Sequence, residues 1–532
     1  MCVNASRFKS SVFGRSNGSE HSGLNSSCIV SQAARPDMTV EPKKLTGGQF
    51  IQAAIQHYEA GRLPEAEDVC KHVLEVNADD ANAIYLLGEI SHRRGDSGRA
   101  VEMMERAIEL KPGNPFFLNN LGEIFRELSR PGDAELLYRR ALALKPDFIK
   151  AHNNLGNALQ SLGRYDEAEQ SYKVAIKLDP ALALPRLNYG LLKLLRGEYG
   201  PGFEFYEQRF DGADPRQTSF IRKVLAGLNG IPRWQGEPLQ GKRILVWAEQ
   251  GLGDCVMMMR YLPLLAGRGA ASVLVLCAAP LLRLMRSLSG VEDAVCEEDD
   301  WTEESFDVHC PIMSLPFLFG TTLETVPVEF PYVRIATEVR QKWALKLAAV
   351  PHPRVGLVWA GGKRTAGEAQ RSMRLQDMAP LRDAGAAGFL SLQKGEAAEE
   401  LAGAHWAIAD FMDECGDLLD TAGLIEQLDL VISVDTSVAH LAGALGKPVW
   451  VITRGESAWQ WMLGRSDSPW YPTMRIFRRS NVESWYELLA GIAGTLKTEL
   501  GNYSNGAPAQ KDGVGTKVTG SAWSRLFQKG EK

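Results

Sequence analysis

Small and apolar residues recur along the first part of the chain with a period of 34 residues. The period is kept at Gly88, Gly122, Gly156 and Gly190; Ala100, Ala134 and Ala168; Ala107, Ala141 and Ala175; Pro112, Pro146 and Pro180; and Tyr138, Tyr172 and Tyr206. Small residues at fixed positions allow two antiparallel helices to approach closely, and proline ends the second helix of each pair. The pattern predicts about five stacked helical hairpins over residues 47–212.

After residue 212 the pattern changes to short apolar runs separated by helical segments. A linker over residues 213–240 leads to apolar runs at 243–249, 272–277 and 306–310, and a second set of runs begins at residue 354. Runs of this length between turn signals are typical of parallel strands covered on both faces. The sequence therefore predicts an α + α/β fold, with a helical solenoid followed by two Rossmann-like domains at residues 241–350 and 351–500.

The two ends of the chain differ from this pattern. Residues 1–46 and 501–532 are rich in small and polar residues, which bury too little apolar surface to offset the cost of ordering. Both segments are therefore predicted to be disordered, and a last helix is predicted before the second of them, over residues 483–496. Met38 as the true first residue accounts for the N-terminal segment equally well, and a Ser-rich transit peptide is a further alternative.

The composition excludes several classes of protein. A net charge of −6 over 532 residues gives no electrostatic reason to expect a nucleic-acid partner. No apolar run reaches the roughly 18 residues that a membrane span needs, so none is expected. The eight cysteines form no CxxC pair, and no His cluster has metal-ligand spacing. These features favour reduced thiols in a cytoplasmic protein, without a metal site.

The stretch LDLVISVDTSVAHLAGALGKPVWVI at residues 428–452 predicts a strand, a turn, a helix and a second strand. Asp435, Thr436 and Ser437 fall at the carboxyl end of the first strand and the start of the helix. Unpaired N–H groups and the positive end of the helix dipole can bind phosphate at such a place, where Thr and Ser add hydroxyl donors. The alternative is that Asp435 or Thr436 only caps the helix.

A second turn, GLGD at residues 251–254, follows the strand predicted at 243–249. Gly251 and Gly253 permit a tight strand-to-helix turn and a close approach of a ligand to the backbone. Asp254 then lies at the start of the next helix, where its alternative role is again that of a cap.

Basic and aromatic residues accompany these turns. The loop Gly361-Gly362-Lys363-Arg364, Arg371 and Lys394 all follow or adjoin predicted strand ends, and cations near a helix N-terminus favour a diphosphate site. Each of them alone can also be an ordinary surface charge. A late aromatic cluster can stack on a base or sugar or can pack in the core; it comprises Trp459, Trp461, Trp470 and Tyr471.

Several of these motifs resemble known families. The 34-residue pattern resembles the tetratricopeptide repeat. GLGD and DTSVAHLAGALGKP, in this order and about 180 residues apart, resemble the heptosyltransferase-type glycosyltransferases of lipopolysaccharide synthesis, which have two Rossmann-like domains in the GT-B arrangement. With GLVWAGG and LSLQKG, the combination is more closely similar to bacterial proteins that join tetratricopeptide repeats to such a domain, and the similarity covers residues 47 to about 498.

The resemblance implies roles for single residues. It implies a metal-independent glycosyltransferase that needs no cofactor and takes a nucleotide-sugar as substrate. Asp254 matches the general base, after a loop that contains Gly251 and Gly253. The residues that match donor contacts are Arg371, Gln393, Lys394, Asp435, Thr436, Ser437 and His440. Because Thr-Ser stands where heptosyltransferases usually have Thr-Gly, the sugar stays open between a hexose, a heptose and an N-acetylhexosamine.

The repeats are expected to bind a protein partner, or the protein or glycan acceptor, in the groove of the solenoid. A spacer or a dimerisation arm is the alternative for this region. For the whole chain, the alternative to an enzyme is a non-catalytic interaction scaffold whose GT-B part is degenerate. If the repeats act only on the acceptor, deletion of residues 47–212 leaves donor binding intact.

Overall fold

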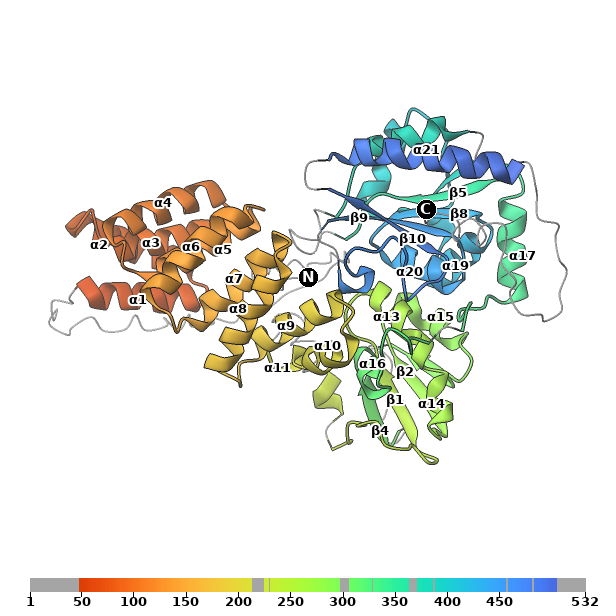
Figure 1. Ribbon diagram of the computed structural model, residues 1–532, viewed down its shortest axis with the longest axis horizontal. Coiled ribbons are helices and arrows are strands. Elements are labelled where there is room, and N and C mark those ends of the chain that lie inside the picture. Colours follow the sequence, from red (N-terminus) through yellow and green to blue (C-terminus); the bar gives the residue numbers. More distant parts are fainter. Residues whose placement is uncertain are drawn as a thin grey trace, which may run out of the picture. The chain divides into compact units, whose positions relative to one another are not determined.

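The computed structural model (Figure 1) describes residues 47–212, 224–228, 230–296, 306–327, 329–362, 371–385, 388–455, 458–480 and 483–504. The N-terminal segment 1–46, the tail from residue 505, residues 213–223 of the predicted linker, and Lys363 and Arg364 lie outside the described residues. The chain divides into two compact units, Asn4–Leu162 and Gly163–Lys532. This division falls inside the predicted repeat region and not in the predicted linker.

The described part of the first unit is helical. Its elements are α1 (Gly47–Glu59), α2 (Leu63–Val76), α3 (Ala81–Arg93), α4 (Ser97–Leu110), α5 (Pro115–Glu127), α6 (Pro131–Leu144) and α7 (Ile149–Ser161). The periodic glycines mark the closest helix contacts: a Cβ on Gly88 would lie 2.9 Å from Met104 Cγ, and one on Gly122 would lie 2.7 Å from the Tyr138 ring. The predicted helical solenoid is thus confirmed, with the small residues where neighbouring helices touch.

The second unit begins with four further helices, α8 (Tyr165–Leu178), α9 (Ala183–Leu195), α10 (Tyr199–Tyr206) and α11 (Arg209–Gly212). They keep the packing of the repeats, since a Cβ on Gly190 would lie 2.7 Å from Phe205 Cβ. Tyr199 and Phe203 of α10 belong to one hydrophobic core that also includes residues of both sheets described below. The last repeat helices are therefore packed as part of the α/β region.

A parallel sheet of four strands follows, with the order β3-β2-β1-β4. Its strands are β1 (Arg243–Trp247), β2 (Ser272–Leu276), β3 (Asp293–Val295) and β4 (Val308–Pro311). The helices between and after them are α13 (Leu252–Met258), α14 (Leu264–Gly267), α15 (Leu282–Arg286) and α16 (Leu315–Leu318). The sequence of residues 255–265 predicts one amphipathic helix, but the structure has α13 to Met258, a 3-10 helix over Met259–Tyr261 and then α14, with Pro263, which lacks an N–H group, directly before α14.

The second sheet has six parallel strands in the order β10-β9-β8-β5-β6-β7. Its strands are β5 (Arg354–Val358), β6 (Gly388–Ser391), β7 (Ala409–Asp410), β8 (Leu430–Val434), β9 (Val449–Arg454) and β10 (Met474–Arg479). The elements around it are α17 (Thr337–Lys346), α19 (Leu418–Glu426), α20 (Ser437–Ala444), α21 (Trp485–Ser504) and the 3-10 helices η5 (Leu375–Ala384), η6 (Glu396–Gly403) and η8 (Trp459–Trp461). Helix α21 is longer than the predicted 483–496 and continues to Ser504.

Alternate residues of each central strand enter different cores. In β8, Leu430, Ile432 and Val434 pack with Leu489 and other residues of α21. Val431, between them, packs in the core that contains α20 and α13. Helix α21 therefore covers one face of the second sheet, and α20 lies on the other (Figure 1). This explains why four of the five residues of β8 are apolar, as expected for a strand buried on both sides.

Candidate functional site

The carboxyl ends of β5, β6 and β8 bring the predicted donor residues to one edge of the second sheet. Val358 of β5 pairs with Ser433 of β8, and Leu357 pairs with Ser391 of β6. Asp435 and Gln393 each follow their strand at this edge, as ligand-binding residues do in doubly wound sheets.

Arg371 is held at this edge beside Asp435. Its Nη1 lies 4.0 Å from Asp435 Oδ2. Gly361 makes room for the guanidinium, because a Cβ on Gly361 would lie 2.8 Å from Arg371 Nε. The Gly361 N–H donates to Ser372 Oγ at 3.1 Å and fixes the loop against the residue after Arg371. A cation, a carboxylate and a helix start are thus close together.

The start of α20 does not use Thr436 as a side-chain cap. Thr436 has the extended backbone of an N-cap residue, but its side chain makes no capping hydrogen bond. Its Oγ1 lies 3.0 Å from Ser433 Oγ instead. Thr436 and Ser437 are both partly exposed. Of the two interpretations of this turn, capping by the Thr436 hydroxyl is therefore excluded, and the positive end of the helix dipole faces outward beside two hydroxyl groups.

His440 is buried on α20, at 3% exposure. Its Nδ1 lies 2.8 Å from Tyr471 Oη, and its ring stacks on Trp461 with centroids 5.0 Å apart. Burial, with the nearby charges of Arg260 and Arg371, lowers the pKa of His440 to about 3. The imidazole is therefore neutral near pH 7. It can take part in hydrogen bonds, but it adds no positive charge to the site.

The aromatic cluster that accompanies His440 is a core. Trp461, Trp470 and Tyr471 are fully buried, and Trp459 is 8% exposed. The Trp470 Nε1–H donates to Tyr199 Oη at 2.8 Å. Core packing, the simpler of the two predicted roles, is what these side chains do here.

Helix α13 meets α20 at Gly253. A Cβ on Gly253 would lie 2.7 Å from His440 Cδ2 and 3.3 Å from Ser437 Cα. The sequence suggested that this glycine serves a tight turn or ligand approach; the structure shows that it also lets the helix carrying Asp254 lie against the start of α20. The two sheets are thereby joined at the candidate site.

Replacing Gly253 with alanine is expected to destabilise the protein by about 1–3 kcal/mol, because the added methyl overpacks the contact with the α20 backbone. Gly267 is the matched control, since nothing lies within 4 Å of a Cβ at that helical position. Urea unfolding of both variants measures the difference. Equal loss of stability in the two would show that the α13–α20 contact is not tight.

Asp254 lies in the first turn of α13 and is partly exposed. Its Oδ2 accepts the Gly251 N–H at 3.1 Å, so the predicted capping role is present. Burial raises the pKa of Asp254 to about 6; the hydrogen bond from Gly251 and the charge of Arg371 oppose the rise, and the charges of Asp435 and Glu249 add to it. The carboxylate thus interacts electrostatically with Arg371 and Asp435 of the second domain, which are 117 and 181 residues away in sequence. A carboxylate with a raised pKa, close to a helix start that can bind phosphate, has the properties of a general base.

Gln393 and Lys394 follow β6 at the predicted edge, and their side chains make hydrogen bonds within the fold. The Gln393 Oε1 accepts the Trp359 and Ala360 N–H groups at 3.2 and 2.9 Å, and its Nε2 donates to the Ala360 and Lys394 carbonyls. This amide therefore joins the ends of β5 and β6. Lys394 is exposed and donates to the Cys415 carbonyl. It lines a hollow of about 290 Å³ with Asp410 and Asp413, and neither Arg371 nor Asp435 lines that hollow.

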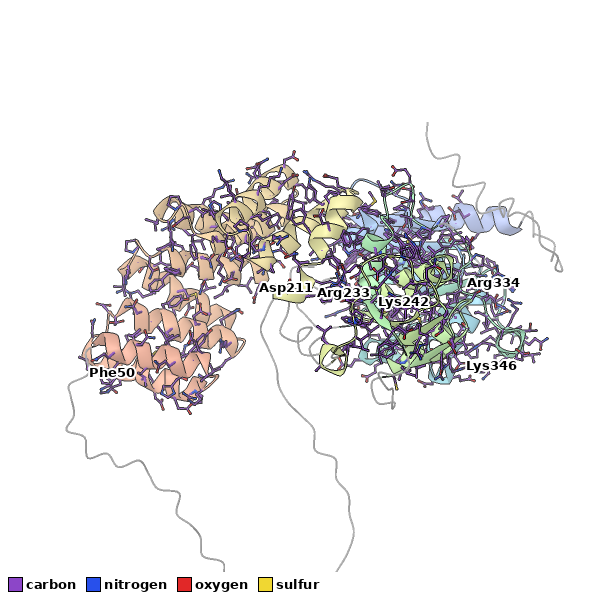
Figure 2. The ribbon with its side chains drawn as sticks, turned by 90° about the horizontal axis from the view of Figure 1, so that it is seen from below. Phe50, Asp211, Arg233, Lys242, Arg334 and Lys346 are labelled. Carbon is purple, nitrogen blue, oxygen red and sulfur yellow. The ribbon has the colours of Figure 1, made fainter. Side chains whose placement is uncertain are left out.

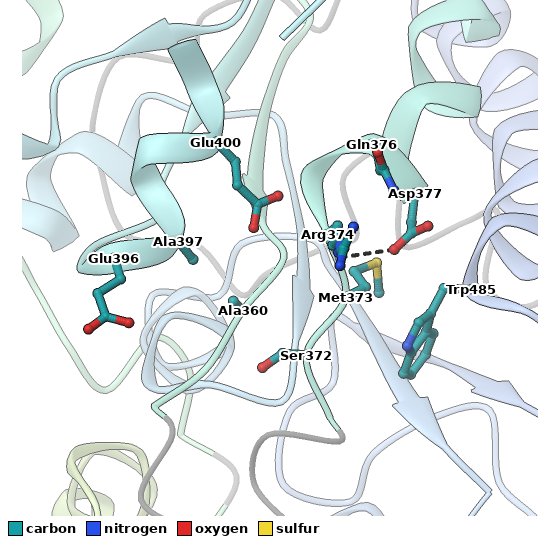
Figure 3. Close-up of a pocket in the computed structure, with 10 residues that line it drawn as sticks. All are labelled: Ala360, Ser372, Met373, Arg374, Gln376, Asp377, Glu396, Ala397, Glu400 and Trp485. Carbon is teal, nitrogen blue, oxygen red and sulfur yellow. Dashed lines mark hydrogen bonds between the residues drawn. The ribbon is translucent and has the colours of Figure 1, made fainter. Parts of the chain in front are cut away.

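A larger hollow of about 500 Å³ is lined by Ser372, the residue that follows Arg371 in the chain (Figure 3). Its lining residues are Ala360, Ser372, Met373, Arg374, Gln376, Asp377, Glu396, Ala397, Glu400 and Trp485. Glu400 accepts the Leu375 N–H at 2.7 Å. The sequence reasoning missed this site, although Glu396 and Glu400, directly after the LSLQKG motif, were a visible signal.

The repeats carry a separate polar network. Asn154 donates to Asn119, Asn119 donates to Asn120, and Asn120 donates to Glu89, over 2.9 to 3.1 Å. These side chains belong to α7, α5 and α3, the first helices of successive repeats. Asn119 and Asn154 are buried and tie the helices together, and only Asn120 and Glu89 are partly exposed, so these two can accept or donate hydrogen bonds at the surface.

Comparison with known families shows tetratricopeptide-repeat models over residues 51–115, 118–148 and 149–182. The chain therefore contains tetratricopeptide repeats over residues 51–182, and its C-terminal region has two parallel sheets and helices. Protein FlbA of Caulobacter vibrioides is 29% identical over 340 residues, which cover 59% of this chain and 55% of FlbA. The chain thus spans about half the length of this curated relative.

Several solved structures are similar in part. PilF of Pseudomonas aeruginosa is 21% identical, covers 34% of this chain and 81% of its own, and has a TM-score of 0.30. YrrB, a tetratricopeptide-repeat protein with an unusual peptide-binding site, is 22% identical with a TM-score of 0.27, covering 34% of this chain and 91% of its own.

Each helix of the described residues is too short or too polar to cross a membrane. Within the same ranges, no group of three or more His, Cys, Asp or Glu side chains is arranged to hold a metal ion.

Proposed function

We propose that the α/β region is a glycosyltransferase of the GT-B type, which moves a sugar from a nucleotide-sugar to a protein or glycan acceptor. The observation that carries the proposal is the close packing of Gly253, the neighbour of Asp254, against Ser437 and His440 of α20, whose start lies beside the Arg371–Asp435 pair. A base from one parallel sheet faces an anion-binding turn from the other, as a transfer reaction between two substrates requires.

The donor diphosphate would lie at the start of α20. Thr436 and Ser437 supply hydroxyl and N–H donors, and Arg371 supplies the positive charge. His440 and Lys394 add no free cation to this scheme, because His440 is neutral and Lys394 lines a different hollow. Arg371 is therefore the residue that offsets the charge of the departing diphosphate, and the proposed reaction uses no bound metal.

The nucleoside would occupy the hollow in Figure 3. Its volume of about 500 Å³ suits a small ligand. Met373 and Trp485 offer apolar and aromatic surface to a base, and Glu396 and Glu400 can accept hydrogen bonds from ribose hydroxyls. The two carboxylates repel phosphate, so they favour an orientation with the diphosphate toward Arg371.

In the transfer step, the acceptor hydroxyl attacks the anomeric carbon and the bond to the diphosphate breaks. The hydroxyl proton moves to the Asp254 carboxylate as the new bond forms. With a pKa of about 6, Asp254 is largely anionic at pH 7 and is a stronger base than an ordinary aspartate. The Arg371 guanidinium stabilises the negative charge that develops on the leaving diphosphate.

The repeats are an interaction region, and we propose that they bind the acceptor or another protein partner. The partly exposed polar pair of Glu89 on α3 and Asn120 on α5 supports this role. We also propose a cytoplasmic site of action, because the six cysteines among the described residues are all free thiols.

Replacing Arg371 with alanine is expected to weaken binding of a nucleoside diphosphate at least about tenfold, since a charge-assisted contact to phosphate is worth roughly 1.5–3 kcal/mol. Calorimetric titration measures the dissociation constant. Arg382→Ala is the control, because Arg382 is an exposed arginine of the same domain that pairs with its neighbour Asp383. Equal affinities in wild type and Arg371→Ala would remove Arg371 from the site.

The second candidate function is a non-catalytic scaffold. It is favoured by Gln393, whose amide is fully engaged within the fold, and by Lys394, which is engaged with the Cys415 carbonyl. A scaffold of this kind would bind proteins through the repeats and would show neither donor hydrolysis nor sugar transfer.

A further inference from the structure

A buried ion pair joins the end of the repeat helices to the loop that carries Asp254. Arg209, the first residue of α11, is 1% exposed, and Glu249, two residues after β1, is 3% exposed. The Arg209 Nε donates to Glu249 Oε2 at 3.1 Å, and Nη2 donates to Oε1 at 2.6 Å. Two parallel hydrogen bonds of this kind fix the relative orientation of both groups.

The rest of the cluster satisfies the buried charges. Arg209 Nη1 donates to Glu207 at 2.7 Å, and its Nη2 also donates to Ser314 Oγ at 2.7 Å. Arg233 (Figure 2) donates to Ser314 Oγ at 2.9 Å and to Glu207. Because every group has partners, removal of Arg209 leaves Glu249 buried without its counter-ion.

The turn between Glu249 and Asp254 is tightly defined. The Cys255 Sγ donates to the Glu249 carbonyl at 3.3 Å, and the Gly251 N–H donates to Asp254 Oδ2. Gln250 has φ of +68°, a left-handed conformation that costs free energy for a residue other than glycine. Asp254 lies five residues after Glu249, and the turn between them is held by these hydrogen bonds. A displacement of Glu249 is therefore expected to displace Asp254 as well.

We propose that Arg209, through its contact with Glu249, is a positioning residue for Asp254, so that the end of the repeat region is part of the catalytic unit. The inference rests on the proposed function of Asp254 as base. It gives the last repeat segment a role in the chemical step besides its role in binding.

The charges around both carboxylates set the expected pH dependence. Asp435 and Arg371 act on Asp254 from the second sheet, and Glu249 acts from the β1 end. Tyr206 of α10 also interacts with the charges of Asp254, Glu249, Arg209 and Glu207. Since the negative charge of Glu249 raises the pKa of Asp254, the two partners of the pair have opposite effects on the base.

The test measures kcat/KM of the full chain as a function of pH and compares the pH at which it falls on the acidic side, called the acidic limb. Glu249→Gln removes a negative charge and is expected to move the limb below pH 6, by roughly half a unit. Arg209→Gln removes the counter-ion and is expected to move it upward by a similar amount and to lower kcat, with the dissociation constant for a nucleoside diphosphate unchanged. The Arg209→Gln/Glu249→Gln double variant restores the limb and also keeps the test possible if a single variant folds poorly.

The control is a second bidentate pair on the same strand. Arg243 at the start of β1 donates to Asp307 at 3.3 and 3.0 Å. Arg243→Gln is expected to leave the limb in place, because this pair lies at the far end of β1 from Glu249. The proposal would be overturned if the acidic limb of kcat/KM stayed at the wild-type pH in both Glu249→Gln and Arg209→Gln. It would also be overturned if the limb shifted by an equal amount in Arg243→Gln.

A second readout does not depend on activity. Amide hydrogen exchange over residues 249–258, followed by mass spectrometry, is expected to become faster in Arg209→Gln and to stay unchanged in Arg243→Gln. If the wild-type chain shows neither transfer nor donor hydrolysis, the proposed function fails, while exchange still decides whether Arg209 positions the loop. Unchanged exchange in Arg209→Gln would overturn the positioning role in that case.

Discussion

Replacing Asp254 with asparagine is expected to lower kcat by about 10²- to 10⁴-fold without changing the melting temperature or donor affinity. Asparagine keeps the size of the side chain and an oxygen that can accept the Gly251 N–H, so the capping role survives. It cannot take a proton from the acceptor hydroxyl. In the wild type, kcat/KM is expected to fall as the pH drops through about 6, because protonation at the raised pKa of Asp254 removes the base.

Glu487→Gln is the matched control for this experiment. Glu487 accepts the Ser484 N–H three residues earlier at 2.7 Å, which is the same capping geometry in α21, on another element. It is expected to leave turnover unchanged. An Asp254→Asn variant with wild-type turnover and stability would show that Asp254 is only a helix cap.

Deleting residues 47–212 is expected to unfold the α/β region, whereas deleting 47–162 leaves it folded. The shorter deletion stops at the boundary between the two compact units. The longer one removes Tyr199, Phe203 and Tyr206 from the shared core, and burial of each such side chain contributes about 1.5–3 kcal/mol. It also removes the partner of Glu249, and breaking a buried ion pair costs roughly 3–5 kcal/mol. Together these losses approach the 5–15 kcal/mol of a typical domain.

Thermal melts and size-exclusion chromatography of the 163–532 and 213–532 fragments distinguish the outcomes. The account predicts a cooperative melt and a monodisperse peak only for 163–532. Equal melting temperatures would show that the last repeat helices are dispensable, as the repeat pattern alone suggested.

Much of the fold follows from local patterns. The 34-residue period places small residues where helices touch, as Gly88 and Gly122 show, and the fully apolar runs identify strands covered on both faces. The position of the DTS turn between a strand and a helix was also predictable, because an apolar run precedes it and a helical pattern follows it.

The long-range part of the site could not be read in the same way. The contact of Gly253 with His440 and the hydrogen bond from Trp470 to Tyr199 join segments far apart in sequence. The identity of a glycine or a tryptophan does not indicate which distant residue it contacts. The neutral state of His440 depends on burial that only the packed structure defines. The likeness of a motif to a donor site likewise could not reveal that the Gln393 amide is used to join two strand ends.

The most direct test of the account is a thermal-shift measurement on the full chain with a panel of nucleoside diphosphates, repeated with Arg371→Ala. A ligand at 100 times its dissociation constant adds about 2.7 kcal/mol to the stability of the protein that binds it. The account predicts that at least one nucleoside diphosphate raises the melting temperature of the wild type, that the rise is much smaller in Arg371→Ala, and that Arg382→Ala behaves like wild type. A panel that leaves the wild-type melting temperature unchanged at millimolar concentrations would contradict the glycosyltransferase assignment and favour a scaffold.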